Sequence, residues 1–254
     1  MLMKSREFIE NLEKKLHLKS PEYQLREISR IQNLEGNVIG AIDILGKMEY
    51  CVGGNTWIGI EQRLDRKDIE IIGLVAKSNL NKFLETYNLL REKLNYKGYL
   101  AGILGHAKQT KKVLKISQSG GDVSGAIDTL WNIGYSLFKS VRSGSCNVPD
   151  KGCDGYLHRS DVETIGVIAK ADQDRFKKVF EYLTKYFSYN KEHLKESYRN
   201  TQIKRIYKIS QIEGDVLGRI IRMEKEGLSL VGSTIYSRDV NRIRDYDSSQ
   251  TPIN

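Results

Sequence analysis

The chain has 254 residues, of which 39% are hydrophobic and 29% charged, and it contains only 3 prolines. This composition excludes a disordered or collagen-like chain and supplies enough apolar residues for a core. The 41 Lys and Arg residues outnumber the 32 Asp and Glu residues, which gives a net charge of +9. A positive surface attracts phosphate-rich partners, so the composition favours nucleic acid, DNA or RNA, over a membrane as the partner.

Cysteine usage and hydropathy predict the compartment. Three cysteines are an odd number in a chain of this length, which argues against a disulfide framework and favours a reducing environment. No apolar run approaches the roughly 20 residues that span a bilayer. The first residues lead directly into a charged segment rather than into the apolar core of a signal peptide. We therefore expect no membrane association and a location in the cytoplasm or an organellar interior.

An internal repeat organises the chain. Residues 113–137 align with residues 206–230 without a gap, with 12 identities in 25 positions at an offset of 93 residues. Residues 28–52 align with the same segment at an offset of 85. Self-similarity of this kind indicates a repeated supersecondary unit. The sequence therefore predicts three diverged copies of one unit.

The similarity continues downstream, where residues 68–77 match residues 161–170. An eight-residue excess in the second copy explains the change of offset. We therefore divide the chain into repeat 1 (1–77), repeat 2 (78–170), a truncated repeat 3 (171–247) and a flexible tail (248–254).

Helices are predicted at two kinds of position. Apolar residues at helical spacing predict amphipathic helices over 6–16, 80–94 and 174–187. A Gly-Asn or Gly-Asp pair provides a turn and an N-cap, which predicts helices that begin at Val38, Val123 and Val216.

Each of these three helices carries a glycine at its third position. Glycine inside a helix costs about 0.5–1 kcal/mol relative to alanine, so its repetition indicates a packing requirement. We expect Gly40, Gly125 and Gly218 to lie at close contacts with another helix or with a sheet.

Strands are predicted from alternating hydrophobicity over 48–52, 135–141 and 228–236, and strand ends over 115–118 and 208–211. The segments 68–77 and 161–170 are interpreted as buried strands, although Ser160 to Glu163 also fits a helix capping box. A hairpin turn is expected at Gly53-Gly54 and a loop over 144–155. The predicted fold is mixed α/β (α+β), with three diverged repeats of a helix–strand–strand–helix unit.

A resemblance to a known family lies in the glycine-containing helices. Residues 38–46, Val-Ile-Gly-Ala-Ile-Asp-Ile-Leu-Gly, resemble the LAGLIDADG motif of homing endonucleases and maturases at its third, fifth, sixth and ninth positions. Residues 123–130 keep the Gly, Ile and Asp, and residues 99–105 resemble the opening of the motif. The resemblance implies two motif helices side by side and DNA binding on curved sheets. The family's metal-binding acid is replaced, however, by Leu45, Leu130 and Met223, which implies binding without cleavage.

Asp43 and Asp128 occupy matching positions on two of these helices. Two carboxylates brought together could share a Mg²⁺ ion, because hard cations take oxygen ligands. If the protein is an enzyme, it is then a Mg²⁺-dependent DNA endonuclease. The alternative is that each acid lies on a helix surface or pairs with a lysine, and in that case no cofactor is expected.

Other candidate ligands and catalytic groups are less regular. A zinc site built from Cys146, Cys153 and His158 would have separations of six and four residues and no clear fourth ligand, unlike the usual spacing. The remaining histidines have no evident Ser or Cys partner in the sequence: His17, His106 and His193.

Two basic stretches are the strongest functional signal. The predicted nucleic-acid-binding residues are Lys108, Lys111, Lys112, Lys115, Lys191, Lys195, Arg199, Lys204, Arg205 and Lys208. Phosphates require cations on one face, and interleaved tyrosines (Tyr189, Tyr198 and Tyr207) can add stacking. The alternative for the second stretch is a solvated helix with salt bridges, because Glu192 and Glu196 lie among its lysines.

The sequence thus leads to one hypothesis, a nucleic-acid-binding protein with LAGLIDADG-like motifs and no cleavage activity. The alternative is a repeat scaffold for protein–protein interaction or self-assembly. The position of the basic residues distinguishes these hypotheses, because a nucleic-acid-binding protein gathers them on one face.

Overall fold

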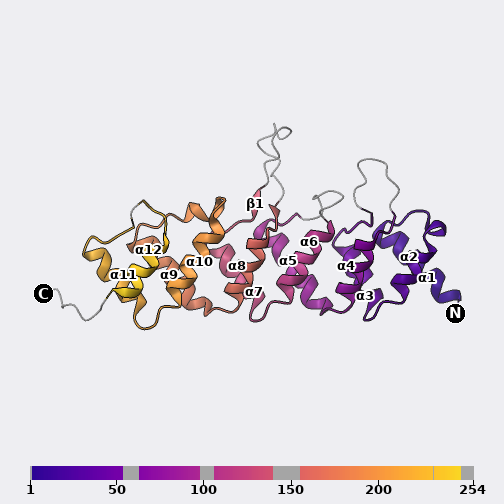
Figure 1. Ribbon diagram of the computed structural model, residues 1–254, viewed down its shortest axis with the longest axis horizontal. Coiled ribbons are helices and arrows are strands. Elements are labelled where there is room, and N and C mark those ends of the chain that lie inside the picture. The colour runs from indigo at the N-terminus through magenta and orange to yellow at the C-terminus, as the bar shows by residue number, and fades with distance from the viewer. Residues whose placement is uncertain (1, 54–62, 98–105, 140–154, 231, 247–254) are drawn as a thin grey trace, which may run out of the picture. The chain divides into compact units, whose positions relative to one another are not determined.

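The computed structural model describes residues 2–53, 63–97, 106–139, 155–230 and 232–246. These residues form mainly α-helices (Figure 1). The helices are α1 (Leu2–Leu16), α2 (Leu25–Gln32), α3 (Val38–Lys47), α4 (Arg66–Ala76), α5 (Leu80–Leu94), α6 (His106–Ser117), α7 (Val123–Asn132), α8 (Arg159–Ala169), α9 (Gln173–Tyr186), α10 (Arg199–Ser210), α11 (Val216–Lys225) and α12 (Ser237–Asp245). The 3-10 helices η1 (Pro21–Tyr23) and η4 (Lys191–Lys195) and the paired strands β1 (Phe138–Lys139) and β2 (Gly155–Tyr156) complete the described elements.

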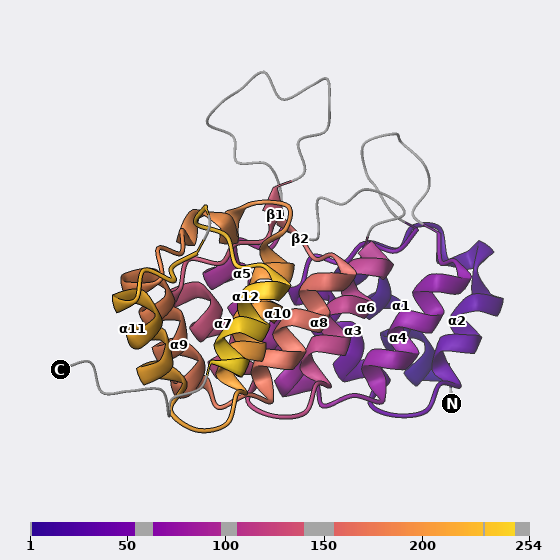
Figure 2. The same cartoon turned by 60° about the vertical axis from the view of Figure 1, so that its left-hand side comes forward.

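The chain divides into two compact units, residues 1–118 with 139–157 and residues 119–138 with 158–254. In the first unit, α2, α4 and α6 pack in one row and α1, α3 and α5 in a second row. In the second unit, α8, α10 and α12 form one row and α7, α9 and α11 the other (Figure 2). Each unit is therefore a two-layered array of helices that bury their apolar faces against each other.

The predicted mixed α/β fold is wrong. Residues 68–77 and 161–170, expected as strands, belong to α4 and α8 or to their C-caps, and the expected strand ends 115–118 and 208–211 close α6 and α10. In α4, Asp65 caps the first turn by accepting hydrogen bonds from the backbone N–H groups of Lys67 and Asp68. Helix propensities differ by only about 0.7 kcal/mol between ordinary residues, so capping and burial outweigh the β-branched composition.

The alternating segments that suggested further strands are also mostly not strands. Residues 48–52 follow α3 as irregular backbone and turn, and in the described part of the segment 135–141 only residues 138–139 form a strand. The described part of 228–236 contains no strand. Met48, Tyr50 and Val52 are nevertheless only 5%, 3% and 0% exposed. Their alternation reflects the burial of loop side chains against helices rather than strand pairing.

The predicted helices are confirmed. Helices begin at Val38, Val123 and Val216, and the preceding Asn37, Asp122 and Asp215 each accept a hydrogen bond from the N–H of the helix's third residue at 2.8–2.9 Å. The amphipathic segments correspond to α1, α5 and α9. The apolar stripe of α9 and its C-cap is buried, as the helical spacing predicts: Phe176, Val179, Phe180, Leu183 and Phe187.

The predicted close contacts of the helix glycines hold in two of the three repeats. A Cβ atom at Gly40 would lie 2.6 Å from the side chain of Leu80, and one at Gly125 would lie 2.6 Å from Gln173. At Gly218, the neighbouring atoms within that range belong to its own N-cap, Asp215. Glycine therefore permits a close helix–helix approach at α3 and α7.

A second glycine joins the turn before α7 to the end of α8. Gly121 has a φ of +86°, and a Cβ atom there would lie 2.0 Å from the carbonyl oxygen of Ala169. The next residue, Asp122, donates its backbone N–H to that oxygen at 2.8 Å. Gly36 and Asn37 make the same contact with Ala76. This turn therefore connects the two rows of helices in the same way in both units.

Several predictions concern residues outside the described part of the chain. These include Gly54 of the expected hairpin turn, most of the loop 144–155 and the tail 248–254. Within the described ranges, none of the helices combines the length and apolar character needed to cross a bilayer.

Candidate nucleic-acid interface

The helices α6 and α10 are equivalent in the repeat and carry the two basic stretches. Each has 12 residues, four of which are Lys or Arg, and neither contains an acidic residue. One lies in each compact unit. Lys108 and Lys115 on α6 and Lys208 on α10 are exposed. Each unit therefore presents a helix of concentrated positive charge.

Two of the basic positions form matching ion pairs between neighbouring helices. Lys111 on α6 pairs with Glu70 on α4 at 2.7 Å, and Lys204 on α10 pairs with Glu163 on α8 at 2.8 Å. The hydrogen bond and charge of Lys204, with a further contribution from Arg159, lower the pKa of Glu163. All four paired side chains remain at least 36% exposed. Solvent therefore screens both pairs, and a phosphate could replace either carboxylate at little cost.

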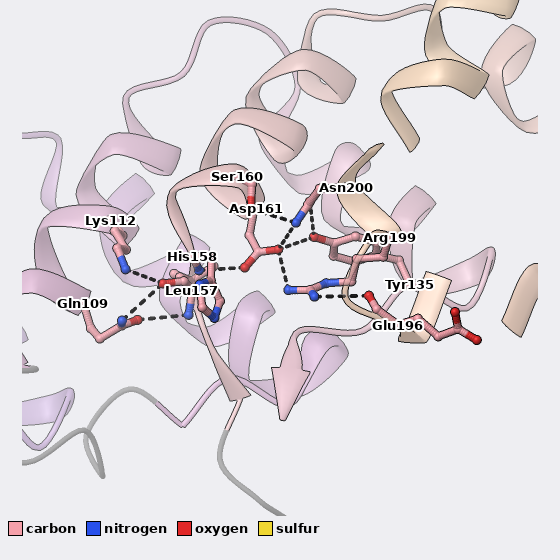
Figure 3. Close-up of polar contacts among 10 residues, drawn as sticks. All are labelled: Gln109, Lys112, Tyr135, Leu157, His158, Ser160, Asp161, Glu196, Arg199 and Asn200. Carbon is pink, nitrogen blue, oxygen red and sulfur yellow. Dashed lines mark hydrogen bonds and ion pairs between the residues drawn. The ribbon is translucent and has the colours of Figure 1, made fainter. Parts of the chain in front are cut away.

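The neighbouring basic residues serve the packing of the repeat. The ammonium group of Lys112 donates to the backbone carbonyl of Leu157, immediately before α8 (Figure 3). Arg205 donates to the equivalent carbonyl of Ile235 at 2.6 Å, before α12. These two side chains hold the segment that enters the next helix, so their charge is partly used within the fold.

A buried glutamine reinforces each of these attachments. Gln109 on α6 donates to the carbonyl of Leu157 at 3.2 Å and accepts from its N–H at 3.0 Å. Gln202 on α10 makes the same pair of bonds with Ile235, at 3.2 and 3.1 Å. In the first repeat, Gln24 accepts from the N–H of Leu64 at 2.6 Å. A glutamine therefore satisfies the backbone of the same loop position in all three repeats.

Asp161 in the first turn of α8 is the centre of a buried polar network (Figure 3). Its Oδ1 accepts hydrogen bonds from the Tyr135 hydroxyl at 2.6 Å, from Arg199 at 2.7 Å and from the Asn200 amide at 2.8 Å. Its Oδ2 accepts from the backbone N–H of His158 at 2.7 Å. Burial, and then the charge of Asp161, raise the pKa of Tyr135 well above its ordinary value, so the phenol remains a proton donor.

The network explains the position of Arg199, which the sequence placed among the nucleic-acid-binding residues. Arg199 is 2% exposed, and its guanidinium is 2.7 Å from Asp161 and 5.6 Å from the centre of the Tyr135 ring. This buried pair joins α10 to α8 and to the loop after α7. Arg199 therefore lies in the core of its unit rather than on the surface.

A reduced form of the network recurs at the equivalent position of α4. The Tyr50 hydroxyl donates to Asp68 Oδ1 at 2.7 Å, and the N–H groups of Gly53 and Asp65 donate to Oδ2. Burial raises the pKa of Asp68 against the opposing effect of these hydrogen bonds. At the start of α12, Asp239 is 1% exposed and accepts from the N–H of Tyr236 at 2.7 Å. A buried aspartate thus fixes the start of the equivalent helix in every repeat.

The other predicted basic residues, Lys191 and Lys195, lie on the surface in η4. Lys195 pairs with Glu192 at 2.8 Å, as the alternative of a salt-bridged segment anticipated. Both lysines line a hollow of about 400 Å³ together with Lys185 of α9. Glu181 and Glu192 line the same hollow, so its charge is mixed.

The two predicted metal ligands, Asp43 and Asp128, lie in different compact units. Asp43 on α3 forms an ion pair with Lys15 of α1, and Asp128 on α7 belongs to the other compact unit. Within the described ranges, no three His, Cys, Asp or Glu side chains cluster as metal ligands. Of the zinc candidates, Cys146 and Cys153 lie outside these ranges, and His158 precedes α8.

His193 has hydroxyl partners that the sequence did not indicate. Its Nε2 is 3.0 Å from Thr234 Oγ1 and 3.3 Å from Ser233 Oγ, and its Nδ1 is 2.7 Å from the Tyr198 hydroxyl. Glu196 also lies 3.3 Å from Nδ1. These bonds attach the loop before α12 to the segment before α10.

Sequence analysis missed the tyrosine–aspartate and glutamine contacts. The signal was present, since Tyr50 and Tyr135 align in the repeat, as do Gln24, Gln109 and Gln202. A polar residue repeated at a position flanked by core residues indicates a buried hydrogen bond.

Comparisons with models of protein families, with curated proteins and with solved structures gave no match. The LAGLIDADG-like segments 38–46 and 123–130 lie on α3 and α7, and the segment 99–105 is outside the described residues.

Proposed function

We propose that this chain is a helical-repeat protein that binds nucleic acid, DNA or RNA, through the basic faces of α6 and α10. One observation supports the proposal above all. The helices α6 and α10 each contain four Lys or Arg residues and no acid, and of these only Arg199 is buried, whereas the chain as a whole has 32 acidic residues to 41 basic ones. Charge concentrated in this way favours a polyanion.

The contact is assigned first to the exposed Lys108 and Lys208. Lys111 and Lys204 are assigned as additional contacts. Each forms an exposed ion pair with a glutamate, and a phosphate can replace that glutamate. Binding of this kind requires no metal ion or other cofactor. It suits a compartment that holds nucleic acid, such as the cytoplasm or an organellar interior.

The test is a binding titration over a range of salt concentrations. The double variant Lys108→Ala/Lys208→Ala is compared with Lys47→Ala/Lys225→Ala, which removes the same charge from exposed positions on α3 and α11. On duplex DNA, each lost phosphate contact reduces the slope of log K against log salt by about 0.9. We expect a reduction of about 1.8 for the first variant and little change for the second. Equal slopes in both variants would exclude α6 and α10 as the binding helices.

A second candidate function, a scaffold for a protein partner, is favoured by a groove in the first unit. The groove has a volume of about 850 Å³ and lies between α1 and the turn that joins α2 to α3. Its lining includes Phe8, Leu34 and Ile39, and Ile39 is 47% exposed. Failure of the wild-type protein to bind any nucleic acid would favour this candidate.

A further inference from the structure

Two half-exposed tyrosines lie at the starts of neighbouring helices in the second unit. Tyr198 is 38% exposed and is the N-cap of α10, and Tyr236 is 43% exposed and is the N-cap of α12. These two helices pack against each other. Tyrosine is not among the residues that favour an N-cap, and several other helices of this chain begin after a capping Asp or Asn. Neither tyrosine is thus a preferred capping residue, and each remains partly exposed.

Tyr236 is held in a fixed position relative to α10. The preceding residue, Ile235, exchanges two hydrogen bonds with the side chain of Gln202, which is 1% exposed. Arg205 adds a third bond to the same carbonyl, and the N–H of Tyr236 itself donates to Asp239. The backbone on both sides of the ring is therefore anchored.

Tyr198 is held through its hydroxyl group. The hydroxyl lies 2.7 Å from Nδ1 of His193, and the two rings are 5.4 Å apart. Thr234, two residues before Tyr236, binds the other nitrogen of His193. The hydrogen bond with Glu196 is the main cause of a raised pKa of Tyr198. One anchored network therefore positions both rings.

Two guanidinium groups lie over the ring of Tyr236. The guanidinium carbon of Arg238 is 5.2 Å from the ring centre and that of Arg205 is 5.8 Å away. In proteins that bind unpaired nucleic acid, bases stack on aromatic side chains while nearby cations contact the phosphates. Two partly exposed rings, one of which carries two guanidinium groups over it, have this combination of properties.

We infer that Tyr198 and Tyr236 form a stacking site for the bases of single-stranded nucleic acid, with Arg205 and Arg238 at its phosphates. The inference rests on the proposed nucleic-acid binding and specifies its ligand as an unpaired strand. In duplex nucleic acid the bases are stacked on one another and are not free to stack on these rings. RNA and DNA strands share this chemistry, and the experiment measures both.

The experiment measures fluorescence anisotropy with labelled single-stranded RNA, single-stranded DNA and duplex DNA at several salt concentrations. Tyr198→Ala and Tyr236→Ala should each weaken single-strand binding about 5- to 150-fold, which corresponds to the loss of one stacked base. Tyr236→Phe should bind nearly as the wild type does, because the ring remains and backbone hydrogen bonds hold it. Tyr23→Ala is the matched control, since Tyr23 is 80% exposed in the first unit.

The salt dependence separates this site from the basic helices. Removal of an uncharged ring should lower the affinity without changing the slope of log K against log salt, whereas Lys108→Ala/Lys208→Ala should change the slope. If the tyrosine-to-alanine variants bind as the wild type does while the lysine variant loses slope, the stacking site is wrong and the proposed function stands. An equal loss for single strands and duplex also overturns the stacking site. If the wild type binds no nucleic acid, both proposals are wrong. Circular dichroism spectra of each variant confirm that the helices are retained.

Discussion

The Tyr135 hydroxyl donates a 2.6 Å hydrogen bond to Asp161, and this bond links the loop after α7 to the first turn of α8. The same carboxylate binds Arg199 and Asn200 at the start of α10. Three parts of the second unit are thus connected through one side chain. Asp161 has no exposed surface. Its carboxylate is therefore stabilised by these partners instead of by water.

Replacement of Tyr135 by phenylalanine should destabilise the protein by about 1–3 kcal/mol, because it removes one donor from a buried carboxylate. Urea denaturation followed by circular dichroism measures the free energy of unfolding. Tyr23→Phe is the control, with an expected change within about 0.5 kcal/mol at an exposed site. Equal stability of the two variants would show that the Tyr135 bond makes no net contribution.

Loss of Arg199 should have a larger effect. Arg199→Met leaves Asp161 as a buried charge without its cation, and removal of one partner from a buried pair costs about 3–5 kcal/mol. Lys204→Met, on the same helix, breaks only the solvent-screened pair with Glu163 and should cost much less. Thermal and urea unfolding of both variants provide the comparison. A smaller loss for Arg199→Met than for Lys204→Met would contradict the assignment of Arg199 to the core.

The turn before α7 offers a test of backbone packing. Gly121→Ala and Gly134→Ala both place alanine at a positive φ, +86° and +88°, and share a strain of about 1–2 kcal/mol. Gly121→Ala also places a Cβ atom against the carbonyl oxygen of Ala169. At Gly134, no atom lies within 4 Å of an added Cβ atom. Gly121→Ala should therefore be less stable by a further 1–3 kcal/mol, roughly the cost of overpacking. Similar unfolding midpoints would show that the turn adapts without cost.

The stability contributed by Asp68 should decrease as the pH rises. Burial raises the pKa of Asp68 in the folded protein above the ordinary value of 3.8. At a pH between 3.8 and the folded-state pKa, the folded protein therefore binds more protons than the unfolded chain. The contribution is complete below about pH 3.8 and is lost as the pH passes through the folded-state pKa. The difference in unfolding free energy between the wild type and Asp68→Asn, measured from pH 3 to 7, should change in this direction. If the wild type instead becomes more stable relative to Asp68→Asn as the pH rises, the pKa of Asp68 is lowered in the folded protein.

Sequence patterns predicted the helices best where a local signal was decisive. The Asp or Asn before Val38, Val123 and Val216 defines the start of a helix through contacts three residues away, and such contacts are visible in a sequence. The segments 68–77 and 161–170 were misassigned because Ile and Val favour strands intrinsically. Their helical state is decided by burial against other helices, which a local pattern does not contain.

The candidate site was likewise predicted only where the signal is local. The basic stretches are evident in the sequence, and α6 and α10 carry most of their residues. The burial of Arg199 depends on Asp161, 38 residues earlier in the chain. Tyr236 joins Tyr198 only because α12 packs on α10. No spacing rule predicts a partner that tertiary packing provides.

The tyrosine–aspartate bond also has a consequence for how the chain tolerates changes in length. Tyr50 and Asp68 are 18 residues apart, whereas Tyr135 and Asp161 are 26 residues apart, yet both pairs make the same bond. The second connection has absorbed eight more residues while the bond that closes it is unchanged. We therefore expect that further residues, such as an affinity tag, can be inserted between the tyrosine and the aspartate without loss of this bond.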